Sequence, residues 1–171
     1  MAALTAGHAR AVRVGGVIAT VTDADLPELL PLMRGYCDFY EVKPSDESLL
    51  SMSRTLIADP ELEGLQLIAR ADDGSAVGFA TIFWSWSTLS ASRLGVMNDL
   101  FVTGDARGGG HADALIAACV ERCRERGATE LAWQTAHTNG RARAVYERVG
   151  ATRDERWLDY SLDVVRAPRS E

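Results

Sequence analysis

Residues 96–114 read VMNDLFVTGDARGGGHADA, an apolar segment that runs through a glycine-rich turn into the start of a helix. Glycine lets the backbone adopt conformations that other residues avoid, and the first turn of a helix leaves N–H groups without intrahelical acceptors. These groups and the helix dipole together attract anions. We therefore expect a strand over residues 96–102 and an anion-binding turn at residues 107–110, with a phosphate as the obvious ligand.

The helix after this turn is marked by the spacing of its apolar residues. They recur at the three- and four-residue intervals of one helix face, at Leu115, Ile116, Cys119, Val120 and Cys123. Gly127 is a typical residue for the end of such a helix. A long amphipathic helix is therefore predicted directly behind the anion-binding turn.

The remaining elements follow from apolar periodicity and from turn residues. Upstream, we expect a strand over residues 17–21, a helix that starts at residue 22 and ends near residues 36–41, a second helix over 44–59, and strands over 65–70 and 77–89. Downstream, we expect a strand over residues 131–136, a helix over 139–150 and a strand over 157–164. This order predicts an α/β (α+β) fold, in which helices cover both faces of a mixed, mostly antiparallel sheet.

Length and composition indicate one soluble globular domain. The chain has 171 residues, of which 47% are hydrophobic and 25% charged, enough for a core without disulfide or metal staples. We expect a flexible tail over residues 1–15 and a single domain over residues 16–171. The net charge of −6 argues against a nucleic-acid-binding protein, since such proteins depend on basic contacts to phosphate.

Cysteine content and hydropathy favour a cytoplasmic protein. Cys37, Cys119 and Cys123 are odd in number and do not suggest a disulfide framework. Cys119 and Cys123 lack a second pair of ligands nearby, so no metal site is expected. No segment approaches the roughly 18 apolar residues of a membrane span, and the N-terminus lacks the apolar core of a signal peptide. We therefore expect no membrane association.

Two motifs in register resemble the GNAT superfamily of N-acetyltransferases. The family signature (Q/R)xxGx(G/A) is matched from Arg107 to Ala112, and NxxAxxxYxxxG is matched downstream by Asn139, Ala142, Tyr146 and Gly150. The segments MNDLFV and YCDFYE look most similar to the polyamine and histone acetyltransferase-like branch. The order of elements from residue 17 to about residue 164 also resembles the family.

The resemblance implies acetyl-CoA as the acetyl donor, and it assigns residues to its parts. Backbone N–H groups would hold the pyrophosphate at Arg107, Gly108, Gly109, Gly110, His111 and Ala112. Backbone groups of Leu100, Phe101 and Val102 would pair with the pantetheine arm, and Asn139 and Ala142 would complete the cofactor site. The family usually opens its central strand at a bulge near these positions.

The resemblance also implies direct attack of an amine on the thioester. Tyr146 matches the general acid that protonates the departing thiolate. Asp99 is the candidate base because it lies on the central strand beside the thioester. In polyamine-acetylating members a Glu precedes this Asp, whereas Asn98 stands here and cannot act as a base. His137 is a minor alternative, because its intrinsic pKa suits proton transfer.

The acceptor pocket is expected to be formed by the first two helices and the strands that face them. Aromatic side chains with a few carboxylates suit an organic cation, and the candidates are Tyr36, Tyr40, Glu41, Trp84, Trp86 and Trp133. Packing in the core or in a subunit interface is an equal alternative for the tryptophans.

These features together favour an N-acetyltransferase that acts on a primary amine of a small molecule. A protein lysine or N-terminal acetyltransferase is an alternative with the same chemistry. A non-catalytic CoA-binding regulatory module is an alternative from another class. A homodimer that uses the last predicted strand, with Trp157 and Tyr160, is a further hypothesis.

Overall fold

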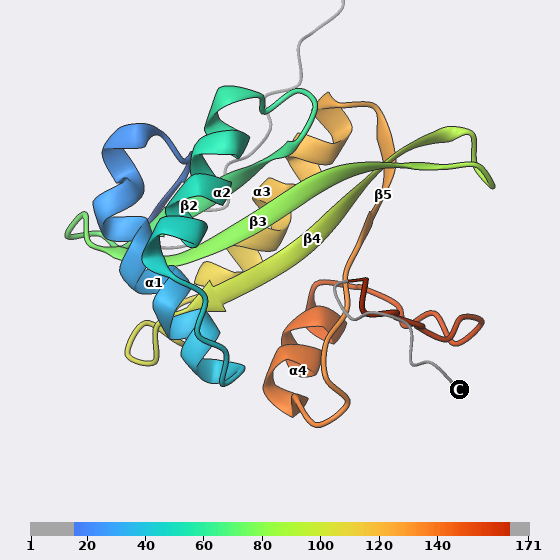
Figure 1. Ribbon diagram of the computed structural model, residues 1–171. Helices are drawn as coiled ribbons and strands as arrows, with labels where there is room; N and C mark the ends of the chain where they lie inside the picture. Colours follow the sequence, from blue (N-terminus) through green and yellow to red (C-terminus); the bar gives the residue numbers. More distant parts are fainter. Residues whose placement is uncertain (1–15, 165–171) are drawn as a thin grey trace, which may run out of the picture. The chain divides into compact units, whose positions relative to one another are not determined.

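The computed structural model describes residues 16–164, which divide into two compact units between Ala136 and His137 (Figure 1). The first unit contains a five-stranded sheet in the order β1-β2-β3-β4-β5. Its strands are β1 Val17–Thr20, β2 Gly64–Arg70, β3 Ala76–Ser87, β4 Ser92–Val102 and β5 Ala128–Ala132. Neighbouring strands are antiparallel except β4 and β5, which are parallel. The predicted mixed, mostly antiparallel sheet is therefore confirmed.

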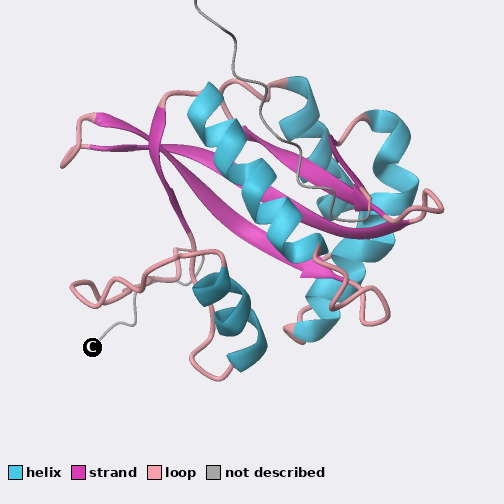
Figure 2. Ribbon diagram, turned by 180° about the vertical axis from the view of Figure 1, so that it is seen from behind, coloured by secondary structure: helices cyan, strands magenta, loops and turns pink. Residues whose placement is uncertain are grey.

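Helices cover both faces of this sheet, as predicted. A short 3₁₀ turn, η1 Asp23–Asp25, leads into α1 Leu26–Phe39, and α2 Asp46–Ala58 follows it. These helices lie on one face, and α3 His111–Glu125 crosses the other face (Figures 1 and 2). Local signals explain the helix starts: Ser45 Oγ accepts the N–H of Ser48 at 3.1 Å and caps α2.

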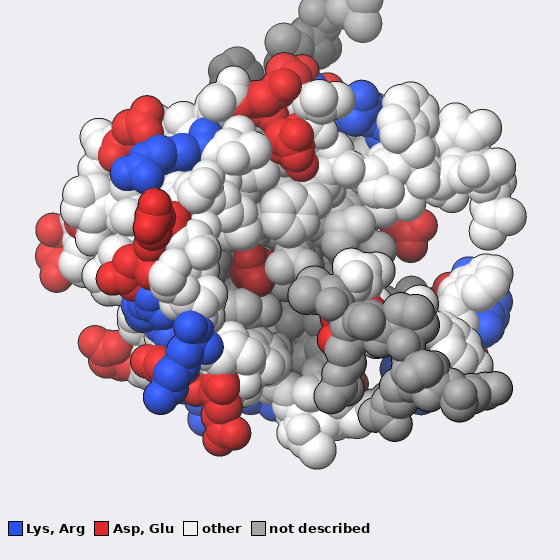
Figure 3. Space-filling view, in the orientation of Figure 1, with Lys and Arg blue, Asp and Glu red and all other residues white. Residues whose placement is uncertain are grey.

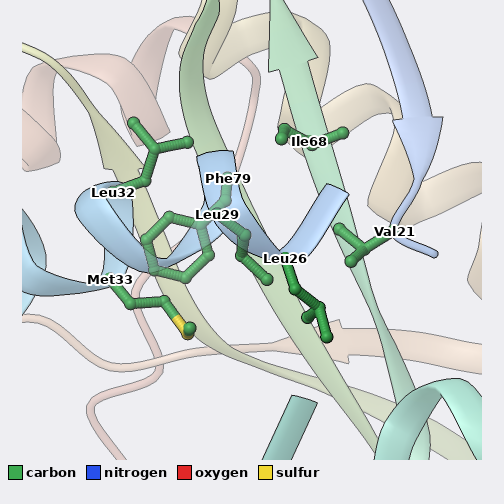
Figure 4. Packing of buried hydrophobic residues seen from close by; sticks show 7 residues of the cluster. All are labelled: Val21, Leu26, Leu29, Leu32, Met33, Ile68 and Phe79. Atoms are coloured by element: carbon green, nitrogen blue, oxygen red, sulfur yellow. The ribbon is translucent and has the colours of Figure 1, made fainter. Parts of the chain in front are cut away.

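One hydrophobic core cluster lies between α1 and the sheet. It is formed by Val21, Leu26, Leu29, Leu32, Met33, Ile68 and Phe79 (Figure 4). Leu29 and Ile68 are completely buried. Burial of each such side chain stabilises the fold by about 1.5–3 kcal/mol before the conformational entropy is counted. The helix spacing that places these residues on one side of α1 therefore fixes α1 against the sheet.

The second unit contains α4 Gly140–Arg148, and here one prediction is wrong. No strand forms over residues 157–164. Apolar residues do alternate with polar ones there, but Tyr160 and Leu162 are about nine-tenths exposed. The N–H of Arg156 bonds to Asp154 Oδ1 at 2.9 Å, a local turn just before the segment. A strand depends on hydrogen bonds from a neighbouring strand, which alternation alone does not provide.

Several boundaries also differ from the predictions. β4 begins at Ser92 instead of residue 96, because the β3–β4 hairpin continues beyond the apolar run. β5 spans Ala128–Ala132, earlier than the predicted residues 131–136. No helix in the described residues is both long and apolar enough to span a bilayer.

Candidate active site

A bulge in the middle of β4 organises the site. Thr81 pairs with Asp99, but the next residue of β3, Ile82, pairs with Met97, so Asn98 is one extra residue in β4. An extra residue reverses which side chains point to each face of the sheet. A Cβ on Gly95, before the bulge, would meet Cys123 of α3, whereas Gly35 of α1 lies against the ring of Phe101, after the bulge. The bulge therefore turns Asp99 to the α1 face.

The same region of β4 has an unpaired edge. β5 pairs with β4 only from Arg93 to Val96, whereas β3 pairs with β4 on the other side as far as Val102. Beyond Val96, no strand of the described chain lies on the β5 side of β4. The backbone of Leu100, Phe101 and Val102 can therefore accept an extended ligand as an added strand, as the sequence predicts for a pantetheine arm.

The glycine-rich turn follows directly at the end of β4. Gly108 and Gly110 have φ angles of +86° and +82°, which other residues rarely adopt. Gly110 is the N-cap of α3, and no side chain caps the helix there. The N–H groups of His111 and Ala112 lie in the first turn of α3, where the helix itself offers them no acceptor. These donors and the dipole of α3 fit the pyrophosphate of acetyl-CoA.

Arg107 ties the glycine-rich turn to β4, and Gly109 is closely packed within the turn. Arg107 Nε donates to the carbonyl of Val102 at 3.1 Å, which ties the turn to the end of the strand. A Cβ on Gly109 would lie 3.2 Å from both the Ala106 carbonyl oxygen and the ring of His111. His111 itself is 8% exposed, so its predicted contribution to the cofactor site would come from its backbone.

Asp99 is a buried carboxyl in a polar environment. Its residue is 8% exposed, and Asn98 Nδ2 donates to its Oδ1 at 3.0 Å. Burial raises the pKa of Asp99, and hydrogen bonds from Thr81, Tyr36 and Asn98 partly oppose this shift. A carboxylate with a raised pKa accepts protons better than an ordinary one, which suits the role predicted for Asp99.

Aromatic side chains of α1 lie next to this carboxyl. Tyr36 Oη donates to the carbonyl of Asn98 at 3.4 Å, and the rings of Tyr36 and Tyr40 are 5.0 Å apart. Burial raises the pKa of Tyr36, and the neighbouring Asp99 raises it further, so the phenol remains neutral. Glu41 is exposed and directly follows the C-cap of α1. The structure therefore brings Tyr36 to Asp99 and places Tyr40 and Glu41 at the same end of α1.

Acidic side chains are numerous on α1, on α2 and on the residues that flank them. Residues 22–59, which include α1 and α2, contain eight acidic and three basic residues and carry a net charge of −5. Figure 3 shows acidic side chains spread over the face that these helices form. The C-terminal end of the α1 dipole is negative, and no basic residue in the last turn of α1 neutralises it. The dipole therefore adds negative potential where Tyr40 and Glu41 lie. This potential favours a cation.

The structure does not group Trp84 and Trp86 with Asp99. Both residues alternate in phase with Ile82, whose side chain packs under Gly95 on the α3 face. Trp84 Nε1 donates to the carbonyl of Pro60 at 2.8 Å, and the guanidinium of Arg126 lies 5.3 Å from its ring. Their placement therefore corrects the expectation that they face the first two helices, and Trp84 has the packing role that the sequence left open.

Trp86 and Trp133 have separate positions. Trp86 is 67% exposed, and the guanidinium of Arg93 lies 4.8 Å from its ring. Trp133 is half-buried and directly follows β5. A role of Trp133 in acceptor binding stays a prediction.

The second motif lies on α4 in the second unit. Asn139 is the N-cap of α4, and its Oδ1 accepts the N–H of Ala142 at 3.1 Å. Tyr146 is one helical turn after Ala142, on the same side of the helix. The carbonyl of His137 accepts a hydrogen bond from Arg143 Nη1 at 3.4 Å. The spacing of the motif thus has a local structural reason, and its catalytic roles stay predictions.

One residue that lies opposite Asp99 was not predicted from the sequence. Thr81 is completely buried in β3, directly opposite Asp99, and its hydroxyl lowers the pKa of that carboxyl. The signal that could have found it is a polar residue within the otherwise apolar segment VGFATIFW.

Comparisons with known proteins identify the family. The acetyltransferase (GNAT) family model matches residues 29–151. The uncharacterized N-acetyltransferase YhfO of Bacillus subtilis is 31% identical over 82% of this chain and 93% of its own. The D-amino-acid N-acetyltransferase HPA3 of Saccharomyces cerevisiae is 28% identical over 81% of this chain and 86% of its own. A crystal structure of a probable acetyltransferase superimposes with a TM-score of 0.77 and 28% identity, over 86% of this chain and 97% of that chain. The resemblance to the superfamily is thus confirmed, the branch stays a prediction, and the chain belongs to the GNAT family of acetyltransferases.

Proposed function

We propose that this acetyltransferase moves the acetyl group of acetyl-CoA to a primary amine of a small organic cation, by direct attack within a ternary complex. The observation that carries the proposal is the bulge at Asn98. It turns a buried carboxyl toward α1 at the point where β4 loses its partner strand. An acceptor binding beside α1 and a donor lying along β4 would therefore meet at Asp99.

The chain offers separate donors to separate parts of acetyl-CoA, whose thioester supplies the activated acetyl group. Peptide groups of Leu100 to Val102 would hold the pantetheine arm, and one N–H would polarise the acetyl carbonyl. Loss of one such donor costs about 3 kcal/mol in comparable enzymes. The N–H groups from Arg107 to Ala112 would bind the pyrophosphate. Asn139 and Ala142 would complete the cofactor site.

Two side chains would move the protons. Asp99 would accept the proton of the ammonium, directly or through water, since burial raises its pKa toward that of a useful base. Tyr146 would donate a proton to the departing CoA thiolate. The stretch 99–102 would then hold the base and the carbonyl donor within one strand.

Two observations support a small cationic acceptor over a protein substrate. The negative potential around the end of α1 attracts an ammonium, and Tyr36 with Tyr40 offers aromatic faces to it. The yeast relative is named for a D-amino acid, which is a small amine. The amine group of such a molecule suits the proposed reaction.

The cell compartment, the domain organisation and the assembly are proposals too. We expect a cytoplasmic protein with one catalytic domain over residues 16–171. Trp157 and Tyr160 are 64% and 90% exposed and suit an apolar contact between two copies in a homodimer. Sedimentation equilibrium at high concentration tests the assembly, and a monomer there would refute the homodimer.

The decisive experiment has two steps. The melting temperature is measured with acetyl-CoA, with NAD and ATP as controls, and a ligand at 100 times its Kd should add about 2.7 kcal/mol. CoA release is then followed with mono- and diamines, D-amino acids and a lysine peptide. Turnover with a small amine supports the proposal, and turnover with the peptide alone supports a protein acetyltransferase. Binding without turnover in either case would indicate a CoA-binding module.

Tyr146→Phe separates the acid role from a packing role. We expect a large loss of kcat with the Kd of acetyl-CoA unchanged, because the ring remains and only the hydroxyl is removed. An unchanged kcat would remove Tyr146 from the mechanism.

A further inference from the structure

Three polar side chains form a row across the buried α1 face of the sheet. Gln66 of β2 pairs with Thr81 of β3, and Thr81 pairs with Asp99 of β4. Their exposed fractions are 2%, 0% and 8%. Directly opposite residues on neighbouring strands are in contact distance, so the three side chains are adjacent. A row of polar groups in a core otherwise built from aliphatic and aromatic residues needs a reason.

The direction of the hydrogen bonds points toward Asp99. Gln66 Nε2 donates to Thr81 Oγ1 at 3.2 Å, which occupies the acceptor side of the hydroxyl. The hydroxyl has a single proton, and Asp99 is the residue directly opposite Thr81 on β4. A donor on the Gln66 side of the hydroxyl directs the proton of Thr81 to the opposite side, where Asp99 lies.

Met33 of α1 fixes the orientation of the amide. Its Sδ lies 3.7 Å from Gln66 Nε2 and 3.7 Å from the hydroxyl oxygen of Ser53. A thioether sulfur only accepts hydrogen bonds, so it favours the NH₂ group of Gln66 over the oxygen. In consequence Gln66 Oε1 is buried without a hydrogen-bond partner in the described chain.

This unsatisfied oxygen shows that the row is not explained by stability. A buried acceptor without a partner is destabilising, and an apolar side chain of similar size at residue 66 would avoid that loss. The row does favour the ionised carboxylate, because Gln66 donates to Thr81 and leaves the proton of that hydroxyl for the side on which Asp99 lies. The arrangement therefore lowers the stability of the fold and favours the ionised state of the Asp99 carboxyl group.

We propose that Thr81 and Gln66 are positioning residues for Asp99, which hold its carboxylate ionised and fixed on the α1 face. The inference deepens the proposed function, since it rests on Asp99 as the base. Within the described chain, the titratable groups that interact with Asp99 are Tyr36 and Cys37 of α1. Burial raises the pKa of both, so both are neutral while Asp99 titrates.

The test is the pH dependence of kcat/KM. Thr81→Val keeps the shape of the side chain and removes the hydroxyl. In this variant we expect the acid limb of the kcat/KM profile to move up by about one pH unit, which is a tenfold change in the acid constant. The KM for acetyl-CoA should stay within about twofold of the wild-type value. Thr81→Ser restores the hydroxyl and should return the limb to its original position. An unshifted limb in Thr81→Val would overturn the proposal, as would an equal loss of rate at every pH.

A second variant and a second readout complete the test. Gln66→Met removes the amide at similar volume and should shift the limb in the same direction by less than Thr81→Val does. The ¹³C signal of the Asp99 carboxyl, assigned with Asp99→Asn, reports the same titration without turnover. If Asp99→Asn retains full activity, the base assignment fails, while an upward shift of the carboxyl titration in Gln66→Met or Thr81→Val still supports positioning. An unchanged titration in Gln66→Met refutes positioning even if Thr81→Val does not fold.

Discussion

Replacing Ala112 with proline should weaken the binding of CoA and leave the helix intact. Ala112 is the second residue of α3, where the helix itself offers its N–H no acceptor. Proline removes that N–H without breaking an intrahelical bond, and it is tolerated in the first turn of helices. This chain already has Pro27 at the second position of α1. The substitution therefore separates ligand binding from folding.

The expected magnitude follows from the bond that would be lost. A hydrogen bond from N–H to a charged phosphate contributes about 1.5–3 kcal/mol, so the Kd of CoA should rise by roughly 10- to 150-fold. The bond between the Ala114 N–H and the Gly110 carbonyl, at 3.0 Å, remains and still closes the first turn. We therefore expect the free energy of unfolding to change by less than about 1 kcal/mol.

Isothermal titration calorimetry with CoA and with pantetheine measures the effect. Pantetheine lacks the pyrophosphate, so its Kd should not change in Ala112→Pro. Ala112→Gly keeps the N–H and costs about 1 kcal/mol in helix propensity, which makes it the matched control for a weakened helix. An unchanged Kd for CoA in a folded Ala112→Pro variant would refute the anion site. An equal loss for both ligands would show damage to the fold instead.

Three other predictions concern the sheet and the thiols. Asp99→Asn should lower kcat/KM by about 100- to 10,000-fold. Because the pKa of Asp99 is raised in the folded state, the wild type loses stability as pH rises from about 4 toward that pKa, and Asp99→Asn should not. Gly95→Ala places a Cβ 2.5 Å from Cys123 Sγ and should cost about 1–3 kcal/mol in urea unfolding, whereas Gly104→Ala, with open space, should not. Burial raises the pKa of Cys119 to about 12 and of Cys123 to about 11, so the native protein should react with a disulfide reagent at pH 8 far more slowly than the unfolded chain. Equal reaction rates would contradict that reasoning.

The sequence predicted most elements of the first unit because their signals are local. The spacing in α3, the Ser45 cap of α2 and the glycine turn each depend on a few neighbouring residues. The strand predicted over residues 157–164 has an equally clear alternation, yet it does not form in the structure. Strand formation depends on a partner elsewhere in the chain, and alternation carries no information about that partner.

Side-chain direction on β3 shows the same limit. Trp84 and Trp86 lie on one face of β3 as predicted, but the alternation does not show whether that face is covered by α1 or by α3. That phase is fixed by Ile82, which packs under Gly95 against α3. The two tryptophans were therefore correctly placed on one face and assigned to the wrong side of the sheet.

The bulge at Asn98 links the two halves of the proposed site. Without the extra residue, Asp99 would follow the phase of Gly95 and face α3, away from Tyr36 and Thr81. A bulge also disrupts the ladder and increases the local twist, which suits the separation of β4 from β5 beyond Val96. One residue thus both aims the carboxyl and opens the strand edge. Asn98 therefore serves the site through its backbone and through the hydrogen bond from its side chain to Asp99, although that side chain cannot act as a base.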